Sequence, residues 1–334
     1  MRWIACELHT HTFHSDGRQS LHELAEGAKS LGFECIALTD HNTMTGLADR
    51  ETVERVTGIT IIPGMEWTTF YGHMVTIGLS QFVDWRTVGV NDIDQGIAKV
   101  HEQGGIAGMA HPFRIGSPIC TGCFWKFNIR DWNALDYIEV WSGTFPPVKH
   151  ANARAFSLWT ERLNEGYRIA AVSGRDWHEQ SNTEELVSVT YLGIEEGDRP
   201  IGERAVHALS KGRTSVTIGP LITLTIEHSQ GSYINGDLVP PSDETETVRA
   251  RVHADFSVRK GVWDIPDQNF KLRIIGNTGL LAEKAIRAED KEYLMDFLQT
   301  GLIWARAELW GTIRHAKVLI AFTNAVYFSN GSRG

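Results

Sequence analysis

The sequence has no long apolar run and no excess of basic residues. No stretch approaches the roughly eighteen apolar residues that suggest a membrane helix, and the opening MRWIACEL lacks the basic and apolar regions of a secretory leader. We therefore expect a cytoplasmic protein without a membrane segment. Asp and Glu (41) outnumber Lys and Arg (32), for a net charge of -9. This balance argues against binding to extended nucleic acid, which requires a basic surface. It allows a small phosphorylated ligand, because bound cations reverse the charge inside one pocket.

Cysteine is also scarce, with 4 residues among 334. Cys6 and Cys35 lie in apolar runs, and we expect them to pack as small buried hydrophobic side chains. Cys120 and Cys123 form a C-x-x-C pair without a second pair, which is a weak signal for zinc or redox chemistry. A surface loop with free thiols is the simpler interpretation. The low cysteine content favours a reducing compartment over a disulfide scaffold.

Hydrophobic patterning divides the chain into two unlike parts, and in the first part strand-like runs alternate with helical stretches. The expected strands cover 2–8, 35–40, 60–66, 73–79, 105–111, 136–141 and 168–174, and the expected helices cover 20–33, 44–58, 92–104, 150–165 and 200–211. Ser20 and Glu23 have the spacing of a capping box at the start of the first helix. The alternation predicts a mostly parallel sheet, and seven strands favour a closed barrel over an open sheet.

The second part follows a period of two. Residues 221–228, 247–256, 270–277 and 316–323 alternate between apolar and polar side chains and are separated by turn residues. This pattern predicts a small antiparallel β-sandwich. We place the domain boundary near Gly219 and Pro220, with domains at 1–218 and 219–334. The β-domain could cover the site, bind a partner or join two copies of the chain into a homo-oligomer.

Histidine and acidic residues gather at the ends of the expected strands. The residues in question are His9, His11, Asp40, His41, Glu66, His73, His111, Asp176 and His178. The carboxyl ends of the strands in an α/β barrel open on one face, so these side chains are expected to converge. His9 and His11 also point to the same side, because positions i and i+2 of an extended chain share a face. The cluster is therefore interpreted as a site.

Imidazole and carboxylate ligands suit Zn, Mn or Fe. The candidate ligands are His9, His11, Asp16, His41, Glu66, His73, His111, Asp176 and His178. One tetrahedral site takes about four ligands, so a set of this size predicts two or three divalent metal ions that share a carboxylate.

The segments HTHTFHSDG, TDHNT, GMEWTTFYGHMVTIGL, MAHPF and SGRDWH resemble, in this order, the motifs of the PHP (polymerase and histidinol phosphatase) metallohydrolases. Within this superfamily the chain is most similar to the carbaryl-hydrolase-like branch of metal-dependent phosphoesterases. The resemblance covers residues 1 to about 218. It implies a distorted seven-stranded (β/α) barrel with up to three divalent metals, here followed by the β-sandwich.

Carried over by motif position, the resemblance implies three ligand sets. These are His9, His11, Glu66 and Asp176 for the first metal, Glu66 as a bridge with His73 and His111 for the second, and Asp16, His41 and His178 for the third. Some family members have His in place of Asp16, and Asp at this position would loosen the third metal or shift its identity towards Mn or Fe. Asp40 is expected to orient a ligand. His14 and His22 match no ligand position and are expected at the surface.

These ligands suggest hydrolysis of a small phosphodiester or phosphomonoester, because a pair of metals about 3.5–4 Å apart brings the pKa of a bridging water to about 7. Arg114 follows His111 closely and could clamp the phosphate, although a salt bridge at the barrel rim is the alternative. Arg175, Lys149 and His150 are weaker candidates for this role.

Aromatic residues flank the expected ligands and either stack on a leaving group or simply wall off the barrel mouth. They are Trp67, Phe70, Tyr71, Phe113, Phe124, Trp125, Trp141 and Trp177. Two other functions stay open. The same site could hydrolyse a carboxyl ester or a carbamate, or the domain could be a non-catalytic module. The second is disfavoured because degenerate PHP domains lose ligands and this chain retains them.

Overall fold

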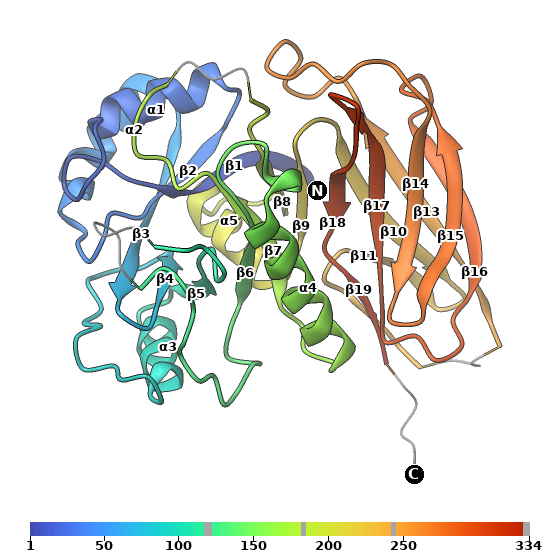
Figure 1. The fold of residues 1–334 in the computed structure, drawn as a ribbon, viewed down its shortest axis with the longest axis horizontal. Coiled ribbons are helices and arrows are strands. Elements are labelled where there is room, and N and C mark those ends of the chain that lie inside the picture. Colours follow the sequence, from blue (N-terminus) through green and yellow to red (C-terminus); the bar gives the residue numbers. More distant parts are fainter. Residues whose placement is uncertain (117–121, 182–184, 242–244, 330–334) are drawn as a thin grey trace.

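The computed structural model describes residues 1–116, 122–181, 185–241 and 245–329. An α/β region and an all-β region lie side by side (Figure 1). The α/β region contains β1 (Arg2–Thr10), α1 (Leu21–Ser30), β2 (Cys35–Leu38), η1 (Thr45–Asp49), α2 (Arg50–Thr57), β3 (Thr60–Thr69), β4 (Gly72–Ile77), α3 (Ile93–Glu102), β5 (Ile106–Met109), β6 (Tyr137–Ser142), η2 (Pro146–Val148), α4 (His150–Asn164), β7 (Ala170–Gly174), β8 (Val189–Ile194), α5 (Ile201–Ser210) and β9 (Thr214–Thr217). All strands and helices expected in this part are present, and η1 and α2 together form the expected helix 44–58. Strands β8 and β9 were not expected.

The start of α1 confirms the capping box. The Ser20 side chain accepts a hydrogen bond from the Glu23 amide at 3.2 Å, and the Glu23 carboxylate accepts one from the Ser20 amide at 2.7 Å. Two amide groups that the helix leaves without partners are thereby satisfied. This fixes where the chain leaves the loop after β1 and enters the helix.

Strands β1 to β7 follow one another in chain order across one sheet. The pairs β1–β2, β2–β3, β5–β6 and β6–β7 are parallel. On its other edge, β1 pairs antiparallel with β8 through residues 2–6, and Thr10 forms an isolated parallel bridge with Trp177 in the segment after β7. The fold is therefore mixed α/β. The closed seven-stranded barrel stays a prediction, because β8 occupies part of the β1 edge that β7 would need.

Strand β4 is the exception in the mostly parallel order of β1 to β7, because it runs antiparallel to both β3 and β5. Strands β3 and β4 are joined by a tight turn in which Thr69 pairs with Gly72. Parallel neighbours require a crossover of a dozen or more residues, so this short connection permits an antiparallel pair only. Gly72 has φ 147°, and a Cβ there would lie 2.9 Å from the ring of Trp125. Glycine is thus required at this turn.

The all-β region contains β10 (Leu221–His228), β11 (Gly231–Ile234), β12 (Leu238–Val239), β13 (Thr247–Asp255), β14 (Phe270–Gly276), β15 (Gly279–Ile286), β16 (Glu292–Leu298), β17 (Trp304–Ile313), β18 (Ala316–Thr323) and β19 (Val326–Phe328). The four strands expected here are present, as β10, β13, β14 and β18. One sheet has the order β11-β10-β13-β16. The large sheet enters this region because β9 pairs with β18. The domain division at residue 218 stays a prediction.

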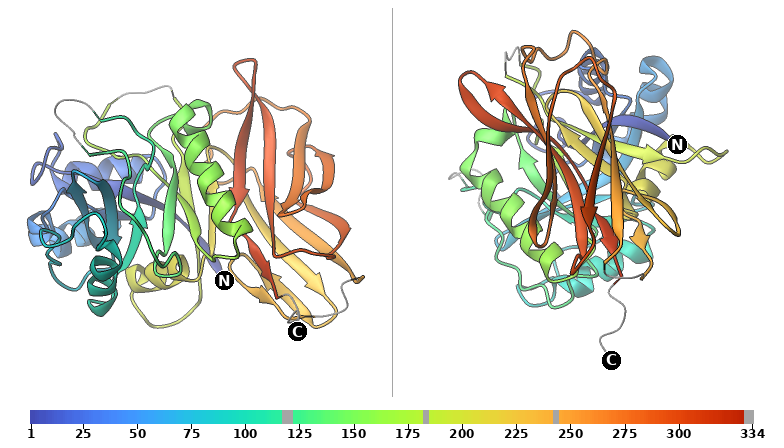
Figure 2. Two further views of the ribbon diagram at one scale, coloured as in Figure 1. Left: turned by 60° about the horizontal axis from the view of Figure 1, so that its bottom comes forward. Right: turned by 90° about the vertical axis from the view of Figure 1, so that its right-hand side faces the viewer.

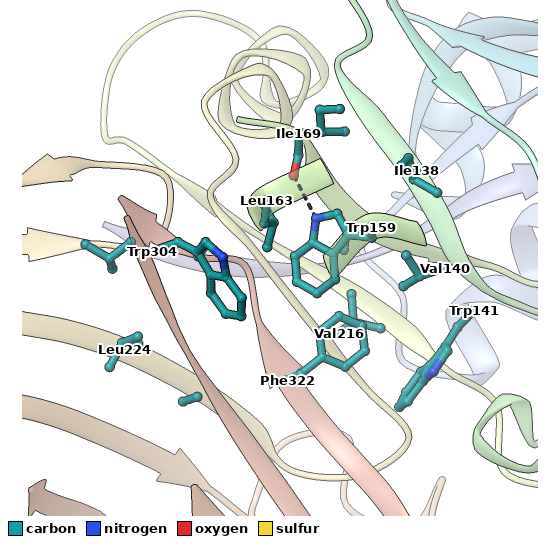
Figure 3. Close-up of a cluster of buried hydrophobic side chains, with 14 of the residues drawn as sticks. Ile138, Val140, Trp141, Trp159, Leu163, Ile169, Val216, Leu224, Trp304 and Phe322 are labelled. Carbon is teal, nitrogen blue, oxygen red and sulfur yellow. Dashed lines mark hydrogen bonds between the residues drawn. The ribbon is translucent and has the colours of Figure 1, made fainter. Parts of the chain in front are cut away.

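Helix α4 lies between the two regions (Figures 1 and 2) and joins them through apolar packing. Trp159 from α4 packs in one buried cluster with Trp304 from β17 and Phe322 from β18 (Figure 3). The indole N–H of Trp159 donates to the carbonyl of Ile169 at 2.8 Å, and that of Trp304 donates to Asn164 at 2.9 Å. A core shared in this way holds the α/β region against the all-β region. Among the described residues, no helix is long and apolar enough to cross a membrane.

Candidate metal centre

The centre is built where β1 and the segment after β7 meet. The Trp177 amide donates to the His9 carbonyl at 3.0 Å, and the His11 amide donates to the Trp177 carbonyl at 2.9 Å. This pairing sets the H-x-H of β1 beside the D-x-H of Asp176 and His178. His9 and His11 share a face of the extended chain, and the left-handed backbone at Asp176 (φ 54°) turns its carboxylate towards them. Asp176 Oδ1 lies 3.4 Å from His9 Nε2 and 3.0 Å from His11 Nε2.

Glu66, near the carboxyl end of β3, lies at the middle of the centre and is fully buried. One carboxylate oxygen, Oε2, lies 3.2 Å from His9 Nε2, 3.4 Å from His11 Nε2 and 2.9 Å from His41 Nδ1. The other, Oε1, lies 2.9 Å from His73 Nδ1 and 3.2 Å from His111 Nε2. Each oxygen of the same carboxylate therefore faces a different group of imidazoles.

The structure brings all nine candidate ligands into three groups whose ligand atoms lie within 4.8 Å of one another. The groups are His9, His11, Glu66 and Asp176; Glu66, His73 and His111; and His11, Asp16, His41 and His178. They coincide with the three sets implied by the sequence resemblance, except that His11 also borders the third group. That each group holds a metal stays a prediction.

The polar atoms at the middle of the centre fit metal ligands. His9 Nε2, both ring nitrogens of His11, Glu66 Oε2, His111 Nδ1 and Asp176 Oδ1 are buried and have no hydrogen-bond partner among the described residues. Buried polar atoms in proteins are nearly always hydrogen-bonded. Imidazole nitrogens and carboxylate oxygens directed at common points are the donor set of Zn, Mn or Fe. The residues present therefore fit divalent metal ions.

Charge in the centre is balanced between the carboxylates and the imidazoles. Burial raises the pKa of Glu66, but His9, His41 and His73 outweigh it and hold the pKa well below its usual value. Burial also raises the pKa of Asp176. His9, His11 and Arg114 outweigh this effect and hold the pKa of Asp176 well below its usual value. Burial lowers the pKa of His11 to about 4, so its ring is neutral near pH 7. The same carboxylates raise the pKa of His9 and of His41 above the usual value, against the effect of burial. Carboxylates held anionic are in the protonation state that binds a metal.

Glu139 on β6 is a functional candidate that the sequence analysis missed. It is buried, and its Oε2 lies 2.7 Å from His9 Nδ1. A carboxylate at one ring nitrogen fixes the orientation of the ring and directs the other nitrogen, here Nε2, into the centre. The signal was present in the sequence as one acidic residue inside the otherwise apolar strand segment YIEVW.

The hydrogen bonds of the Asp40 carboxylate within the described part of the chain go to a loop and not to a candidate ligand side chain. The carboxylate accepts hydrogen bonds from the Thr12 amide, the Thr12 hydroxyl and the Ser15 hydroxyl, each at 2.7 Å. These bonds order the turn between His11 and Asp16. The expected orienting role of Asp40 stays a prediction, and the contacts indicate that it would act through this turn.

A cavity opens over the centre and is lined by Asp16, His41, His73, His111, Arg114, Ile115, Gly116, Cys123, Asp176 and His178. Arg114 contacts the Asp176 carboxylate while half of its side chain stays exposed. Lys149 lies near Arg114, and both line a second cavity that also borders His111. Burial and Arg114 lower the pKa of Lys149. Two cationic groups thus stand beside the mouth of the centre.

Other candidates lie away from the centre. The Arg175 guanidinium packs over the Trp177 ring at 4.4 Å and lines a different cavity with Ser181, so it does not share the cavity over the centre. His150 begins α4 and is exposed. His14 and His22 are exposed as expected, and Cys6 and Cys35 are buried as expected. Cys123 is buried and borders the centre, while its C-x-x-C partner Cys120 lies outside the described residues.

Seven of these aromatic residues fall into three groups. Trp67, Trp141 and Trp177 are buried and belong to the hydrophobic core. Phe70 and Tyr71 are exposed at the turn between β3 and β4. Phe113 and Phe124 lie against the Arg154 guanidinium, 4.2 and 5.5 Å from its carbon to the ring centroids. The buried tryptophans therefore pack in the core, and a role of the aromatic residues in stacking on a leaving group or walling off the mouth stays a prediction.

Comparison with known proteins relates part of the sequence to a known domain family. The sequence profile of the PHP domain matches residues 7–101. An uncharacterized protein of Methanocaldococcus jannaschii is 30% identical over 150 residues, which are 42% of this chain and 82% of that protein. A 5'-3' exoribonuclease of Haemophilus influenzae is 38% identical over 63 residues, 19% of this chain and 23% of that protein.

The fold has a relative among solved structures that spans both regions. A two-domain protein from Bacteroides vulgatus, described as containing a PHP-like metal-dependent phosphoesterase, superimposes with a TM-score of 0.54 at 16% identity. The match covers 97% of this chain and 95% of that one. The profile match begins at β1 and includes His9, His11, Asp16, His41, Glu66 and His73. The chain belongs to the PHP domain family, the metallohydrolase family that its motifs resemble.

Proposed function

We propose that the protein is a metal-dependent phosphoesterase that hydrolyses a small phosphodiester or phosphomonoester. The observation that carries the proposal is Glu66, whose two oxygens face separate groups of imidazoles while buried ligand atoms around it lack hydrogen bonds. A carboxylate placed in this way can be shared by two cations. The similarity to the exoribonuclease of Haemophilus influenzae supports a phosphodiester as the substrate of this protein.

Two or three divalent ions, of Mn, Fe or Zn, would occupy the three groups. His9, His11, Glu66 and Asp176 would hold the first, Glu66, His73 and His111 the second, and Asp16, His41 and His178 the third, with His11 at its border. When bound, such ions supply a water of lowered pKa and positive charge for the phosphoryl oxygens. Asp16 is exposed and His178 partly so, hence the third ion would be the most accessible to solvent.

The chain's own residues would bind and orient the substrate at the mouth. Arg114 is anchored by Asp176 on one side and exposed on the other, so its remaining N–H groups can donate to phosphate oxygens. Lys149 adds a second cation beside it. On the inner side, Glu139 fixes the His9 ring and Asp40 holds the turn that carries Asp16. Because the inner ligands are buried, bulk water is excluded beneath the reacting phosphate.

The first test compares an aryl phosphodiester, an aryl phosphomonoester and an aryl carboxyl ester, each with the chelator-treated protein and with the same protein supplied with Mn²⁺. We expect hydrolysis of a phosphate ester that requires the added metal. Equal turnover by the chelated and the metal-supplied protein would contradict the proposal. Cleavage of the carboxyl ester alone would instead favour the carboxyl-ester or carbamate hydrolase.

Arg114→Ala separates these two chemistries. For a phosphoesterase we expect kcat/KM to fall about 30-fold, equivalent to about 2 kcal/mol, because a charge-assisted contact with phosphate is lost. A carbonyl hydrolase would be nearly unaffected. Arg175→Ala is the matched control, since it removes a neighbouring guanidinium that points away from the centre. A loss of the same size in both variants would show that Arg114 has no specific role with phosphate.

A further inference from the structure

Beneath the candidate metal centre, β1 and β7 approach each other without a continuous hydrogen-bonded ladder. Their pairing at the top is the bridge between Thr10 and Trp177. Lower down, β1 pairs with β8 instead, through residues 2–6. The stretch between these two pairings carries Glu7 and His9 on β1, opposite Gly174 and Arg175 at the end of β7. Backbone amides in this gap require another acceptor, because they are buried away from water.

Glu7 supplies that acceptor. Its side chain is buried, and its position two residues before His9 directs it to the same face of β1 as His9 and His11. A single oxygen, Oε1, accepts hydrogen bonds from the His9 amide at 3.0 Å and from the Arg175 amide at 2.8 Å. One bond lies within β1 and the other crosses to the end of β7. The carboxylate therefore takes the place of the missing rung between the two strands.

Both amides belong to segments that carry candidate ligands. His9 is itself a ligand candidate, and Arg175 directly precedes Asp176. Asp176 has φ 54°, a left-handed conformation that costs a non-glycine residue free energy and needs support from its surroundings. The position of the peptide before it is thus a determinant of where the Asp176 carboxylate lies relative to His9.

We propose that Glu7 is a positioning residue for the metal centre, whose oxygen sets the spacing between His9 and Asp176 by holding the amides of His9 and Arg175. This inference rests on the proposed function, since it concerns the affinity of the same centre for its metal. Glu7 belongs to none of the three groups of candidate ligands. Its effect on the metal is exerted through the backbone.

Two conservative substitutions separate the effect of the position of the Glu7 oxygen from the effect of the carboxylate charge. Glu7→Gln removes the charge but keeps an oxygen at the same distance from the backbone. Glu7→Asp keeps the charge but withdraws the oxygen by one methylene, so that it cannot reach both amides. If Glu7 acts by position, Glu7→Asp weakens Mn²⁺ binding about 10-fold or more, the scale seen for residues that orient metal ligands. Glu7→Gln then binds Mn²⁺ with nearly the affinity of the unaltered protein.

Isothermal titration of the chelator-treated full chain with Mn²⁺ measures these affinities, and urea unfolding of the same metal-free samples reports their stability. Glu308→Asp is the matched control, because Glu308 is also buried and hydrogen-bonded but lies on β17, away from the centre. We expect Glu308→Asp to lower stability and to leave Mn²⁺ affinity unchanged. A merely structural role of Glu7 would give the same result for Glu7→Asp.

Each other outcome has a defined meaning. Unchanged Mn²⁺ affinity in Glu7→Asp, or a loss in Glu7→Gln as large as in Glu7→Asp, overturns the proposal. Should Glu7→Asp fail to fold, Glu7→Met, which fills a similar volume without an acceptor, replaces it with the same expected loss. Failure of both to fold also overturns the proposal, because Glu7 would then be a residue of the fold. If the unaltered protein binds no Mn²⁺, the proposed function itself fails, and this inference falls with it.

Discussion

The two regions of the molecule bury charged side chains in opposite ways. In the α/β region, His9, His11, Glu66 and Asp176 lie at strand ends with ligand atoms that face one another and lack hydrogen bonds. In the all-β region, Arg306 and Glu308 lie side by side on β17, equally buried but paired.

The pairing on β17 involves both side chains. Arg306 Nε donates to Glu308 Oε1 at 2.9 Å, and the Trp310 indole donates to Glu308 Oε2 at 2.9 Å. Arg306 Nη1 reaches Thr160 on α4 at 3.0 Å, and the guanidinium lies 4.7 Å from the Trp159 ring centroid. Burial of charge alone therefore does not identify a functional site. Unpaired polar atoms that converge on one point do, because the fold gives them no partner and a ligand can.

The largest expected effect is that of Glu66→Gln on turnover. The amide presents one oxygen and one N–H group where two anionic oxygens stood, so it cannot be shared by two cations. We expect kcat/KM for the preferred phosphate ester to fall about 1,000-fold, the upper scale for loss of one central electrostatic group, with the far-UV circular dichroism unchanged. Metal content by elemental analysis should fall in parallel. Glu26→Gln, at an exposed position on α1, is the control. Full activity of Glu66→Gln would refute the bridging role.

The opposite behaviour is expected from Arg306→Met. This change leaves the Glu308 carboxylate buried without its cation, and breaking a buried pair in this way costs about 3–5 kcal/mol of unfolding free energy. Urea denaturation measures the loss, while kcat/KM of the folded protein stays unchanged. The double variant Arg306→Met with Glu308→Met should recover most of the stability, since no charge is left unpaired. A loss of activity without a loss of stability would contradict the assignment of the Arg306–Glu308 pair to stability alone.

Much of this contrast could be predicted from the sequence, because the candidate ligands stand at strand ends. His9, His41, Glu66 and His111 are far apart in the chain, but their places after successive strands were enough to predict that they converge. The orientation of Arg175 could not be inferred in this way, because the strand ends at Gly174 and the backbone at Asp176 is left-handed. Glu7 and Glu139 could not be assigned partners, because the sequence does not show which strand interiors face His9.

The fold was predictable in its local elements and less so in its long-range pairing. The short link between the expected strands at 60–66 and 73–79 already required an antiparallel β4. By contrast, β8 pairs with β1 across most of the α/β region, and β9 pairs with β18 far along the chain. Such pairings depend on which strand edges remain free after the rest of the sheet has formed. The hydrophobic pattern of a single segment does not indicate which distant strand will pair with it.

Glu139→Gln tests whether a paired carboxylate next to the centre contributes to metal affinity. The substitution replaces the carboxylate beside His9 Nδ1 with an amide, so the hydrogen bond that fixes the His9 ring weakens. We expect Mn²⁺ affinity to fall about 10- to 100-fold, as for other residues that orient a metal-bound histidine. Isothermal titration of the metal-free protein measures the change, and Glu26→Gln again serves as the control. Unaltered affinity would show that the ring is held by its packing alone.

The smallest expected effect tests a paired charge inside the α/β region itself. His101 at the end of α3 is partly exposed, and its Nε2 lies 2.8 Å from Asp136 Oδ2. The hydrogen bond to Asp136 raises the pKa of His101 above the usual 6.5, against the opposing effect of burial. The folded protein therefore binds the proton more tightly than the unfolded chain. The resulting stabilisation is fully present below pH 6.5 and is lost as the pH rises through the pKa of the folded state.

Urea unfolding of the unaltered protein and of His101→Gln, compared between pH 5.5 and pH 8.5, measures this contribution. Because the pair is partly exposed and screened by solvent, we expect the stability advantage of His101 to shrink by only about 0.5 kcal/mol over that range. Activity should be the same in both proteins at each pH, since the pair lies outside the candidate metal centre. If the stability advantage of the unaltered protein over His101→Gln grew with pH, the pKa of His101 would be lowered and not raised. A pH-dependent difference in activity would mean that a paired charge can also serve the site, and the distinction between paired and unpaired buried charge would then lose its functional meaning.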